Sequence, residues 1–474
     1  MIPLLSLAVF LVLCSSIRCE EGFKLPLRRV SRPGRQSGVP GSLLSSEVSI
    51  RDSQEYAYVA EINIGGQEFP VLLDTGSSDL WVISADCTEP DCLGLSMYKP
   101  TPTLSITDTP FALDYLMGSV SGTVGYDTVT LGNYQICSQV FAIAEDAADL
   151  SLSATGYSGI MGLSFPAAAA IATTSGIGLL ENLFSAFQND SNRYFAYKLG
   201  RDDDPAQDVS SFTIGQVDTD VLSAFHAEDV EFDEIPVVSR PDGTYDYWKV
   251  PLVSITIDSQ PLQLSPSRIA GQSDPLAVLD TGTTLILGPT RDVEDFWGSF
   301  GGESTRKNAW GQWEVKCERA VRVGFLLGSE EGKGSEYVVD PSDVSWSAGG
   351  KSDGWCLGGV QANDGVNSAD WILGDVFLRN VYVKHQVPTP SQPATVGLLQ
   401  ITDADSAMSR FKEQRGQDTA PPVQVRSKMQ RRRSLKLTPA VLFTTTWIIG
   451  FVGGGVGRAV IYRMKNSLRV NRKR

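Results

Sequence analysis

The chain carries the same short pattern twice. Residues 70–83 read PVLLDTGSSDLWVI, and residues 277–288 read AVLDTGTTLILG. Each copy is an apolar run, then Asp-Thr-Gly, then a hydroxyl residue, then apolar residues again. This pattern predicts a strand that ends in an aspartate, Asp74 in one copy and Asp280 in the other. Placing a charge at the end of a buried strand costs free energy, so we expect both aspartates to have a function.

More of the sequence is duplicated around these two copies. SGIMGLSFP follows Asp74, and DWILGDVFL follows Asp280 at nearly the same distance. YAYVAEINIGG precedes the first aspartate and YWKVPLVSITIDSQ the second. A lone Asp-Thr-Gly often makes a turn, but two copies with matching neighbours indicate duplication. We therefore expect two homologous lobes, residues 51–225 and 226–403, joined near HAEDVEFDE. Short strand-like runs between turn residues predict that both are mostly β.

A local twofold axis between such lobes would bring Asp74 and Asp280 face to face. Two carboxylates a few ångströms apart share one proton and titrate as a pair. The ionised member can then take a proton from water while the protonated member donates one to a carbonyl oxygen. The sequence therefore predicts general acid–base hydrolysis of an amide.

The residues after each aspartate suit this chemistry. Glycine lets backbone N–H groups approach the inner carboxylate oxygens, a hydroxyl can bind the outer oxygen, and the threonine between can tie the loops together. The predicted supporting residues are Thr75, Gly76 and Ser77 in the first loop and Thr281, Gly282 and Thr283 in the second.

Over roughly residues 50–402 the chain resembles the pepsin-like aspartic proteases. The resemblance rests on DTGSSDLWV, GYDTVTLG, GIMGLSFP, YWKVPL, VLDTGTT and ILGDVFLRNVYV. It implies a bilobal β fold, a cleft between the lobes for polypeptide substrates and a β-hairpin flap over it. No CxxC pair or His cluster in the sequence suggests a metal, and we expect no cofactor.

The resemblance also identifies the flap as FALDYLMGSVSGTVGYDTV. Tyr115 matches the flap tyrosine and Trp81 its hydrogen-bond donor; the alternative is that both are core aromatics. The family commonly has a small, glycine-rich tip after the tyrosine, whereas this chain has Leu116 and Met117. We expect these bulkier side chains to reshape the central pockets.

The N-terminal residues are typical of a secreted protein. Residues 1–19 have the apolar stretch of a signal peptide. Residues 20–50 are basic, and FKLPLRRV resembles the start of a pepsin-type propeptide. Arg28-Arg29 is a possible cleavage site. The alternative for 20–50 is an unstructured leader.

Three segments follow the predicted lobes. Residues 404–437 are polar and basic, and predict a disordered stalk in which RRRSL is a possible shedding site. Residues 438–457 contain no charge and are long enough for a transmembrane helix. Residues 458–474 would be a basic cytosolic tail. The expected product is a single-pass type I membrane protein of the secretory pathway, at the cell surface or in an acidic vacuolar or endosomal compartment.

Cysteines and one sequon fit a secretory protein. The predicted disulfides are Cys87–Cys92 and Cys317–Cys356, which leave Cys137 as a buried free thiol. Asn189 begins the sequon Asn-Asp-Ser and is the predicted glycosylation site.

Charge narrows the function further. Residues 426–474 hold 13 basic and no acidic side chains, which leaves 27 basic and 55 acidic residues elsewhere. Such an acidic body excludes nucleic-acid binding and suits either solubility or an acidic compartment. We expect a monomeric aspartic endopeptidase. One alternative is a catalytically silent pepsin-fold binding or inhibitor protein, which would be expected to lose an aspartate or glycine of a motif. A glycosidase, which also uses two carboxylates, is a weaker alternative because nothing beyond the acid pair supports it.

Overall fold

The computed structural model describes residues 22–31, 56–201, 209–227, 229, 231–329, 333–346 and 353–425. These residues belong to one compact unit that ends at Lys428. The predicted signal peptide, transmembrane segment and cytosolic tail lie outside the described residues. Within the described ranges, no helix has the length and apolar character needed to cross a membrane.

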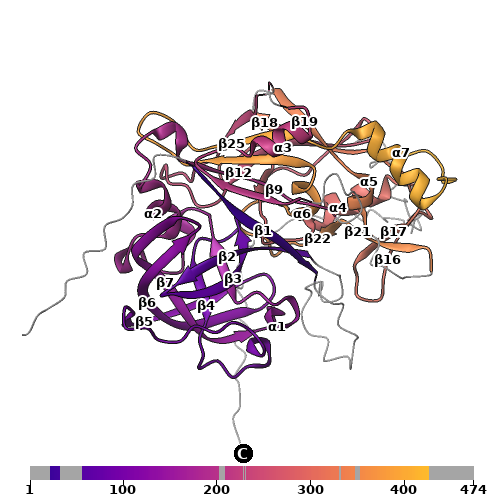
Figure 1. Ribbon diagram of the computed structural model, residues 1–474. Helices are drawn as coiled ribbons and strands as arrows, with labels where there is room; N and C mark the ends of the chain where they lie inside the picture. Colours follow the sequence, from indigo (N-terminus) through magenta and orange to yellow (C-terminus); the bar gives the residue numbers. More distant parts are fainter. Residues whose placement is uncertain are drawn as a thin grey trace, which may run out of the picture. The chain divides into compact units, whose positions relative to one another are not determined.

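The fold is mostly β, as the sequence predicts (Figure 1). The strands are β1 (Phe23–Ser31), β2 (Tyr56–Ile64), β3 (Gln67–Asp74), β4 (Leu80–Ile83), β5 (Ser105–Asp114), β6 (Ser119–Leu131), β7 (Tyr134–Ala148), β8 (Gly159–Gly162), β9 (Tyr194–Lys198), β10 (Ser211–Ile214), β11 (Asp233–Pro236), β12 (Lys249–Ile257), β13 (Gln260–Leu262), β14 (Leu276–Leu279), β15 (Ile286–Gly288), β16 (Thr305–Lys307), β17 (Trp313–Lys316), β18 (Val323–Ser329), β19 (Lys333–Val339), β20 (Ser345–Trp346), β21 (Trp355–Gly358), β22 (Val360–Ala362), β23 (Trp371–Leu373), β24 (Val381–Gln386) and β25 (Thr395–Gln400).

Helices are short by comparison. The α-helices are α1 (Leu152–Thr155), α2 (Leu179–Ser185), α3 (Thr219–Ala224), α4 (Thr290–Gly298), α5 (Pro341–Val344), α6 (Asp375–Leu378) and α7 (Ala404–Arg415). The single 3-10 turns are η1 (Pro90–Cys92), η2 (Pro166–Ala168), η3 (Thr173–Ser175) and η4 (Asp190–Asn192).

Both copies of the duplicated pattern form the same arrangement of strands. In the first, β8 lies between β3, to which it is parallel, and β4, to which it is antiparallel. In the second, β23 lies in the same way between β14 and β15. Asp74 is the last residue of β3 and Asp280 directly follows β14, and each of these strands pairs with the apolar-apolar-Gly strand of its own copy of the pattern.

Equivalent hairpins precede the two aspartates, and each turns through two residues with positive φ. Gly65 (φ 59°) and Gly66 (φ 82°) connect β2 to β3. In the other copy Asp258 (φ 46°) and Ser259 (φ 62°) connect β12 to β13. Two-residue turns of this kind match the twist of the strands they join, so the hairpin register is set locally.

A 13-stranded sheet runs through both predicted lobes, in the order β11-β25-β24-β9-β10-β1-β2-β3-β8-β4-β7-β6-β5. An 8-stranded sheet contains β19-β18-β12-β14-β23-β15-β22 with β13 beside β12, and a 4-stranded sheet contains β16-β17-β21-β20. Because β11, β24 and β25 come from beyond residue 225, the larger sheet joins the two lobes through paired backbone.

Strand β1 lies inside the segment predicted as a propeptide. It pairs antiparallel with β10 over Phe23–Pro26 and with β2 over Leu27–Ser31. In Figure 1, β1 is drawn in indigo beside β2. Leu25 is 1% exposed. The alternative of an unstructured leader is therefore wrong for residues 23–31, whereas removal of the segment remains a prediction.

The predicted disordered stalk is wrong for its first part. Residues 404–415 form helix α7. Asp403 is its N-cap, and its side chain accepts a hydrogen bond from Ser406 N at 2.8 Å. Ala407 and Phe411, one turn apart, are buried. Residues 416–425 continue along the body, where Gln424 N donates to Ser299 O at 3.0 Å.

Both predicted disulfides are confirmed: Cys87–Cys92 and Cys317–Cys356. The prediction of a free thiol at Cys137 is wrong, because Cys137 is also disulfide-bonded.

Candidate active site

The two aspartates occupy matching positions and are held by matching bonds. Asp74 Oδ1 accepts a hydrogen bond from Gly76 N at 2.8 Å, and its Oδ2 accepts one from Ser77 Oγ at 2.6 Å. In the second loop Gly282 N and Thr283 Oγ1 donate to the two oxygens of Asp280 at 2.8 and 2.7 Å. Each carboxyl group is thus oriented by its own loop.

The two threonines tie the loops to each other across the local twofold. Thr75 N donates to Thr281 Oγ1 and Thr281 N to Thr75 Oγ1, both at 3.1 Å. Thr75 Oγ1 donates in turn to Leu279 O at 2.9 Å, and Thr281 Oγ1 to Leu73 O at 2.6 Å. These four buried bonds fix the separation of the loops.

The glycines allow the carboxyl groups to meet. A Cβ added at Gly76 would lie 2.4 Å from the carboxyl carbon of Asp280, and one at Gly282 would lie 2.4 Å from Asp74 Oδ1. Any side chain at either position would therefore displace the opposite carboxyl group. With glycine in both places, the carboxyl groups of Asp74 and Asp280 can lie close enough together for each to affect the protonation of the other.

Burial governs the charge of this pair. Asp74 is 4% exposed and Asp280 8% exposed. Burial raises the pKa of both carboxyl groups, and for Asp74 the neighbouring charge of Asp280 raises the pKa further. The hydrogen bonds from each loop act in the opposite direction, because they favour the ionised form. The result is a pair that retains one proton over a wide range of acidic pH.

A hairpin formed by β5 and β6 ends beside the aspartates. Its tip is closed by a hydrogen bond from Tyr115 N to Gly118 O at 2.9 Å, with Gly118 at φ 92°. Trp81 Nε1 donates to Tyr115 Oη at 2.7 Å. The structure thus brings together the two aromatic residues predicted for the flap, and Trp81, which is fully buried, anchors the tip.

A cleft contains both aspartates and the flap tip. Its walls are largely apolar and come from both lobes; the sequence analysis identified Leu116 and Met117 but missed most of the others. The walls include Leu72, Leu113, Leu150, Tyr157 and Ile160 on one side and Val278, Leu285, Leu287, Val366 and Ile372 on the other. Six of them lie inside the duplicated motifs, which is the signal that would have found them: Leu72, Ile160, Val278, Leu285, Leu287 and Ile372.

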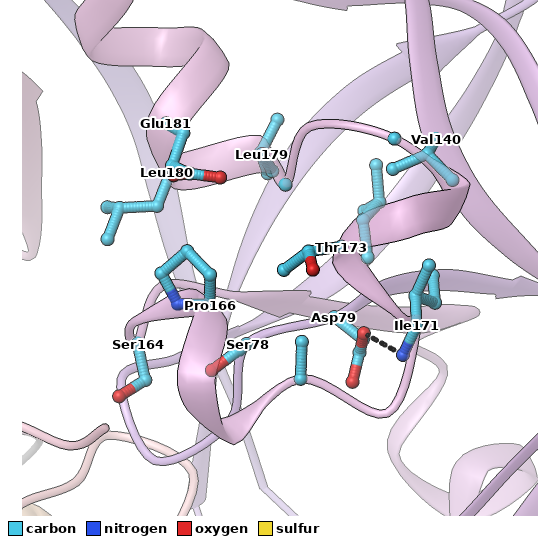
Figure 2. Close-up of a pocket in the computed structure, with 14 residues that line it drawn as sticks. Ser78, Asp79, Val140, Ser164, Pro166, Ile171, Thr173, Leu179, Leu180 and Glu181 are labelled. Atoms are coloured by element: carbon cyan, nitrogen blue, oxygen red, sulfur yellow. Dashed lines mark hydrogen bonds between the residues drawn. The ribbon is translucent and has the colours of Figure 1, made fainter. Parts of the chain in front are cut away.

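Asp79 supports a loop at the edge of this cleft. Its buried carboxylate accepts hydrogen bonds from Ala170 N at 2.7 Å and Ile171 N at 2.9 Å. Figure 2 shows the bond to Ile171 beside a small hollow that Ser78 and Pro166 also line. Burial raises its pKa. Ala168 in the same loop lines the cleft, so Asp79 links the first aspartate loop to the cleft edge.

A buried histidine lies behind the threonines. His385 on β24 is 0% exposed and packs against Phe195, Tyr197 and Trp248, with ring centroids 4.8, 5.5 and 4.5 Å away. Its Nε2 is 3.2 Å from Tyr197 Oη, and Tyr197 lies close to Thr75. Burial lowers the pKa of His385 to about 3. No pattern in the sequence singles out this residue.

Asn189 is exposed at the start of η4, where its side-chain oxygen accepts a hydrogen bond from Ser191 N at 3.1 Å. The sequon therefore lies on the surface.

Known proteins resemble this chain over the region that carries the site. The family model for eukaryotic aspartyl proteases matches residues 57–392. Embryonic pepsinogen of Gallus gallus is 31% identical over 69% of this chain and 76% of its own length. Pepsin A of Canis lupus familiaris is 28% identical over 70% and 79%. Major aspartyl peptidase 1 of Cryptococcus neoformans var. grubii is 25% identical over 82% and 78%. The chain belongs to the eukaryotic aspartyl protease family.

Proposed function

We propose that the protein is an aspartic endopeptidase in which Asp74 and Asp280 are the catalytic residues. The observation that carries this proposal is the close pair of buried carboxyl groups, each held by its own glycine and hydroxyl residue. The pair lies in a cleft with apolar walls on both sides, which suits an extended polypeptide.

The reaction follows from the single shared proton. The ionised carboxylate takes a proton from a water molecule, whose oxygen forms a bond to the carbonyl carbon, while the protonated carboxyl donates its proton to the carbonyl oxygen. Breaking the C–N bond of the resulting diol, with proton transfer to the nitrogen, releases two peptides and restores the pair. Ser77 and Thr283 keep the carboxyl groups oriented, and the flap carrying Tyr115 excludes solvent.

Acidic pH is required by this scheme. Above the raised pKa of the pair, both carboxyl groups are ionised and no proton remains for the carbonyl oxygen. We therefore expect activity on the acidic side of neutrality, with a fall as the last proton is lost.

Hydrolysis of an unfolded protein at pH about 4 tests the proposal, with and without a statine-type transition-state mimic. Asp74→Asn and Asp280→Asn should each lose activity by at least about a thousandfold, the range of general acid–base contributions. Exposed Asp86→Asn serves as the control and should match the parent. Failure of the processed parent protein to cleave anything between pH 3 and 7 would favour the binding protein instead.

We further propose that the enzyme is made in the secretory pathway and anchored by residues 438–457, with the catalytic body on the lumenal or extracellular side. The uncharged segment and its basic flanks in the sequence support this. Carbonate extraction of membranes should leave the full chain in the pellet and release a chain that ends at residue 425. If the full chain and the shortened chain are released equally, residues 438–457 do not anchor the protein in the membrane. Loss of mass on treatment with a glycosidase, abolished by Asn189→Gln, would establish the glycosylation site.

A further inference from the structure

A strained turn forms part of the cleft wall. Residues 149–151 connect β7 to α1, and both Asp149 (φ 58°) and Ser151 (φ 57°) adopt the left-handed conformation. Because Asp149 and Ser151 carry a Cβ, this conformation is less favourable for them than for glycine. Leu150, between them, is 6% exposed and lines the cleft. Because the turn is unfavourable by itself, something outside it must hold it.

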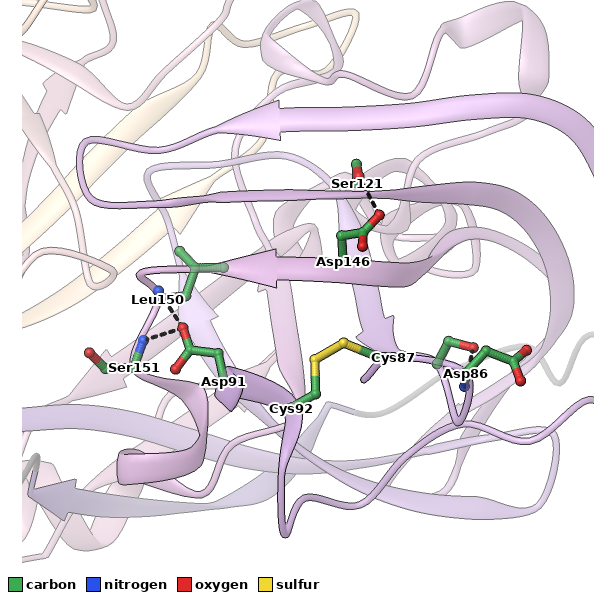
Figure 3. Close-up of a disulfide and its surroundings, with 9 residues drawn as sticks. Asp86, Cys87, Asp91, Cys92, Ser121, Asp146, Leu150 and Ser151 are labelled. Atoms are coloured by element: carbon green, nitrogen blue, oxygen red, sulfur yellow. Dashed lines mark hydrogen bonds between the residues drawn. A yellow bond between two sulfur atoms is a disulfide. The ribbon is translucent and has the colours of Figure 1, made fainter. Parts of the chain in front are cut away.

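Asp91 holds the turn. Its Oδ2 accepts hydrogen bonds from Leu150 N at 2.8 Å and Ser151 N at 3.0 Å. Figure 3 shows the carboxylate reaching both nitrogens from beside the disulfide. Two N–H donors to one carboxylate oxygen are charge-assisted bonds, stronger than bonds between neutral groups.

The disulfide fixes Asp91 itself. Asp91 is the central residue of η1, which begins at Pro90 and ends at Cys92, and Cys87–Cys92 closes this loop. Both sulfur-bearing residues are buried, at 4% and 0% exposed. The backbone that carries the Asp91 carboxylate is therefore constrained at both sides.

Leu150 connects this support to the flap. It belongs to the same apolar cluster as Cys87, Cys92, Leu113 and the partly buried Tyr115. A shift of the turn would change both the cleft wall and the packing beneath the flap tip. Asp86, directly before the disulfide loop, is exposed, and its backbone N donates to Ser84 Oγ at 3.1 Å.

We propose that Asp91, held by the Cys87–Cys92 disulfide, is a specificity-determining positioning residue: it fixes the turn 149–151 so that Leu150 forms a rigid apolar pocket for one side chain of a bound polypeptide. This inference rests on the proposed peptidase activity. Asp91 acts through the turn and does not touch the reacting atoms.

The test first identifies the substrate position that Leu150 contacts. A peptide library is cleaved by the parent and by Leu150→Ala, and the position at which the variant loses the parent's residue preference is taken as the one in contact with Leu150. Two peptides are then compared that differ only at this position: the leucine peptide has leucine there and the alanine peptide has alanine. We expect Asp91→Ala to lower kcat/KM about tenfold for the leucine peptide, mainly through KM, and less than about twofold for the alanine peptide. Asp91→Asn retains one acceptor oxygen and should lose less. Asp86→Ala is the matched control and should equal the parent.

A double-mutant cycle separates positioning from general damage. In a Leu150→Ala background, Asp91→Ala should have little further effect on the leucine peptide. If Asp91→Ala does not fold, Asp91→Asn and the double variant Cys87→Ser/Cys92→Ser must each lower kcat/KM more for the leucine peptide than for the alanine peptide. An equal loss on both peptides, or the full tenfold loss without Leu150, overturns the inference. A parent protein that cleaves neither peptide at any acidic pH refutes the peptidase proposal instead.

Discussion

At the scale of single residues, two buried sites respond to pH in opposite directions. The folded protein keeps a proton on the carboxyl pair at pH values where an unfolded aspartate, with its pKa of 3.8, has lost it. It also keeps His385 neutral at pH values where an unfolded histidine is protonated. The first site therefore lowers the free energy of unfolding as pH rises, and the second lowers it as pH falls.

The carboxyl pair can be tested through stability as well as activity. Because the pKa of Asp74 is raised by folding, the native state binds more protons than the unfolded state above pH 3.8, and stability falls as pH rises. Asp74→Asn stays neutral at every pH. We expect it to be more stable than the parent at pH 7, by about 1 kcal/mol or more, and close to it at pH 3. Urea unfolding at the two pH values measures this, and a constant difference would contradict the raised pKa.

His385 should set the acid limit of the fold. An unfolded histidine takes up a proton below pH 6.5, but the buried one does so only near pH 3. Between these values stability is lost as pH falls, by up to about 1.4 kcal/mol per pH unit. We expect His385→Phe, which keeps the ring packing, to lose less stability between pH 6 and 3.5 than the parent in urea titrations. Exposed His226→Gln is the control and should keep the parental slope. The same slope in His385→Phe would show that the histidine titrates normally.

At the scale of elements, sequence reasoning succeeded where the signal was duplicated. The strands that carry Asp74 and Asp280, their partners β8 and β23, and the flap hairpin were all predicted, because each has a pattern that the other lobe or the family repeats. Helix α7 was missed because its composition is polar. The signal was present in Asp403 as an N-cap and in Ala407 and Phe411 four positions apart.

Contacts between distant parts of the chain left no such signal. Nothing in CTEPDC indicates that Asp91 binds backbone 59 and 60 residues away. Nothing near His385 indicates Tyr197. Such pairs depend on how the elements meet in space, which local propensity and periodicity do not encode.

The segment after α7 is an element whose attachment can be measured. Arg319, with a side chain 4% exposed, donates to Phe300 O, Pro421 O and Asp418 at 2.9, 2.9 and 2.6 Å. Truncating one partner of a buried charged pair leaves the other unpaired. We expect Arg319→Met to lower the free energy of unfolding by about 3 kcal/mol.

Arg322 offers a matched control for that change. It pairs with Asp405 of α7, but the two side chains are 40% and 89% exposed. Because exposed pairs contribute little, Arg322→Met should cost less than about 1 kcal/mol. Chemical denaturation of both variants gives the comparison. Equal losses, or no loss in Arg319→Met, would mean that residues 416–425 add nothing to the stability of the body.

At the scale of the whole molecule, the larger sheet makes the two predicted lobes one folded body. Strand β1 is the connection: without it, β10 and β2 would each have a free edge, and unpaired edges of this kind are open to aggregation. Cleavage at Arg28-Arg29 would fall between residues paired with Val59 and Tyr58. In place of the removal expected from the sequence, we therefore expect an active enzyme to retain β1, even when it is cut after residue 31.

Leu25 provides the measurement, because it is 1% exposed and belongs to the same core cluster as Tyr58 and Phe212. Leu25→Ala should lower the free energy of unfolding by about 2–4 kcal/mol, the usual loss on truncating a buried leucine. Arg28→Ala, on the same strand with a side chain 58% exposed, should cost less than about 1 kcal/mol. Mass spectrometry of the purified active enzyme should also detect residues 23–31. An active and equally stable enzyme that lacks these residues would show that another segment takes the place of β1 in the sheet.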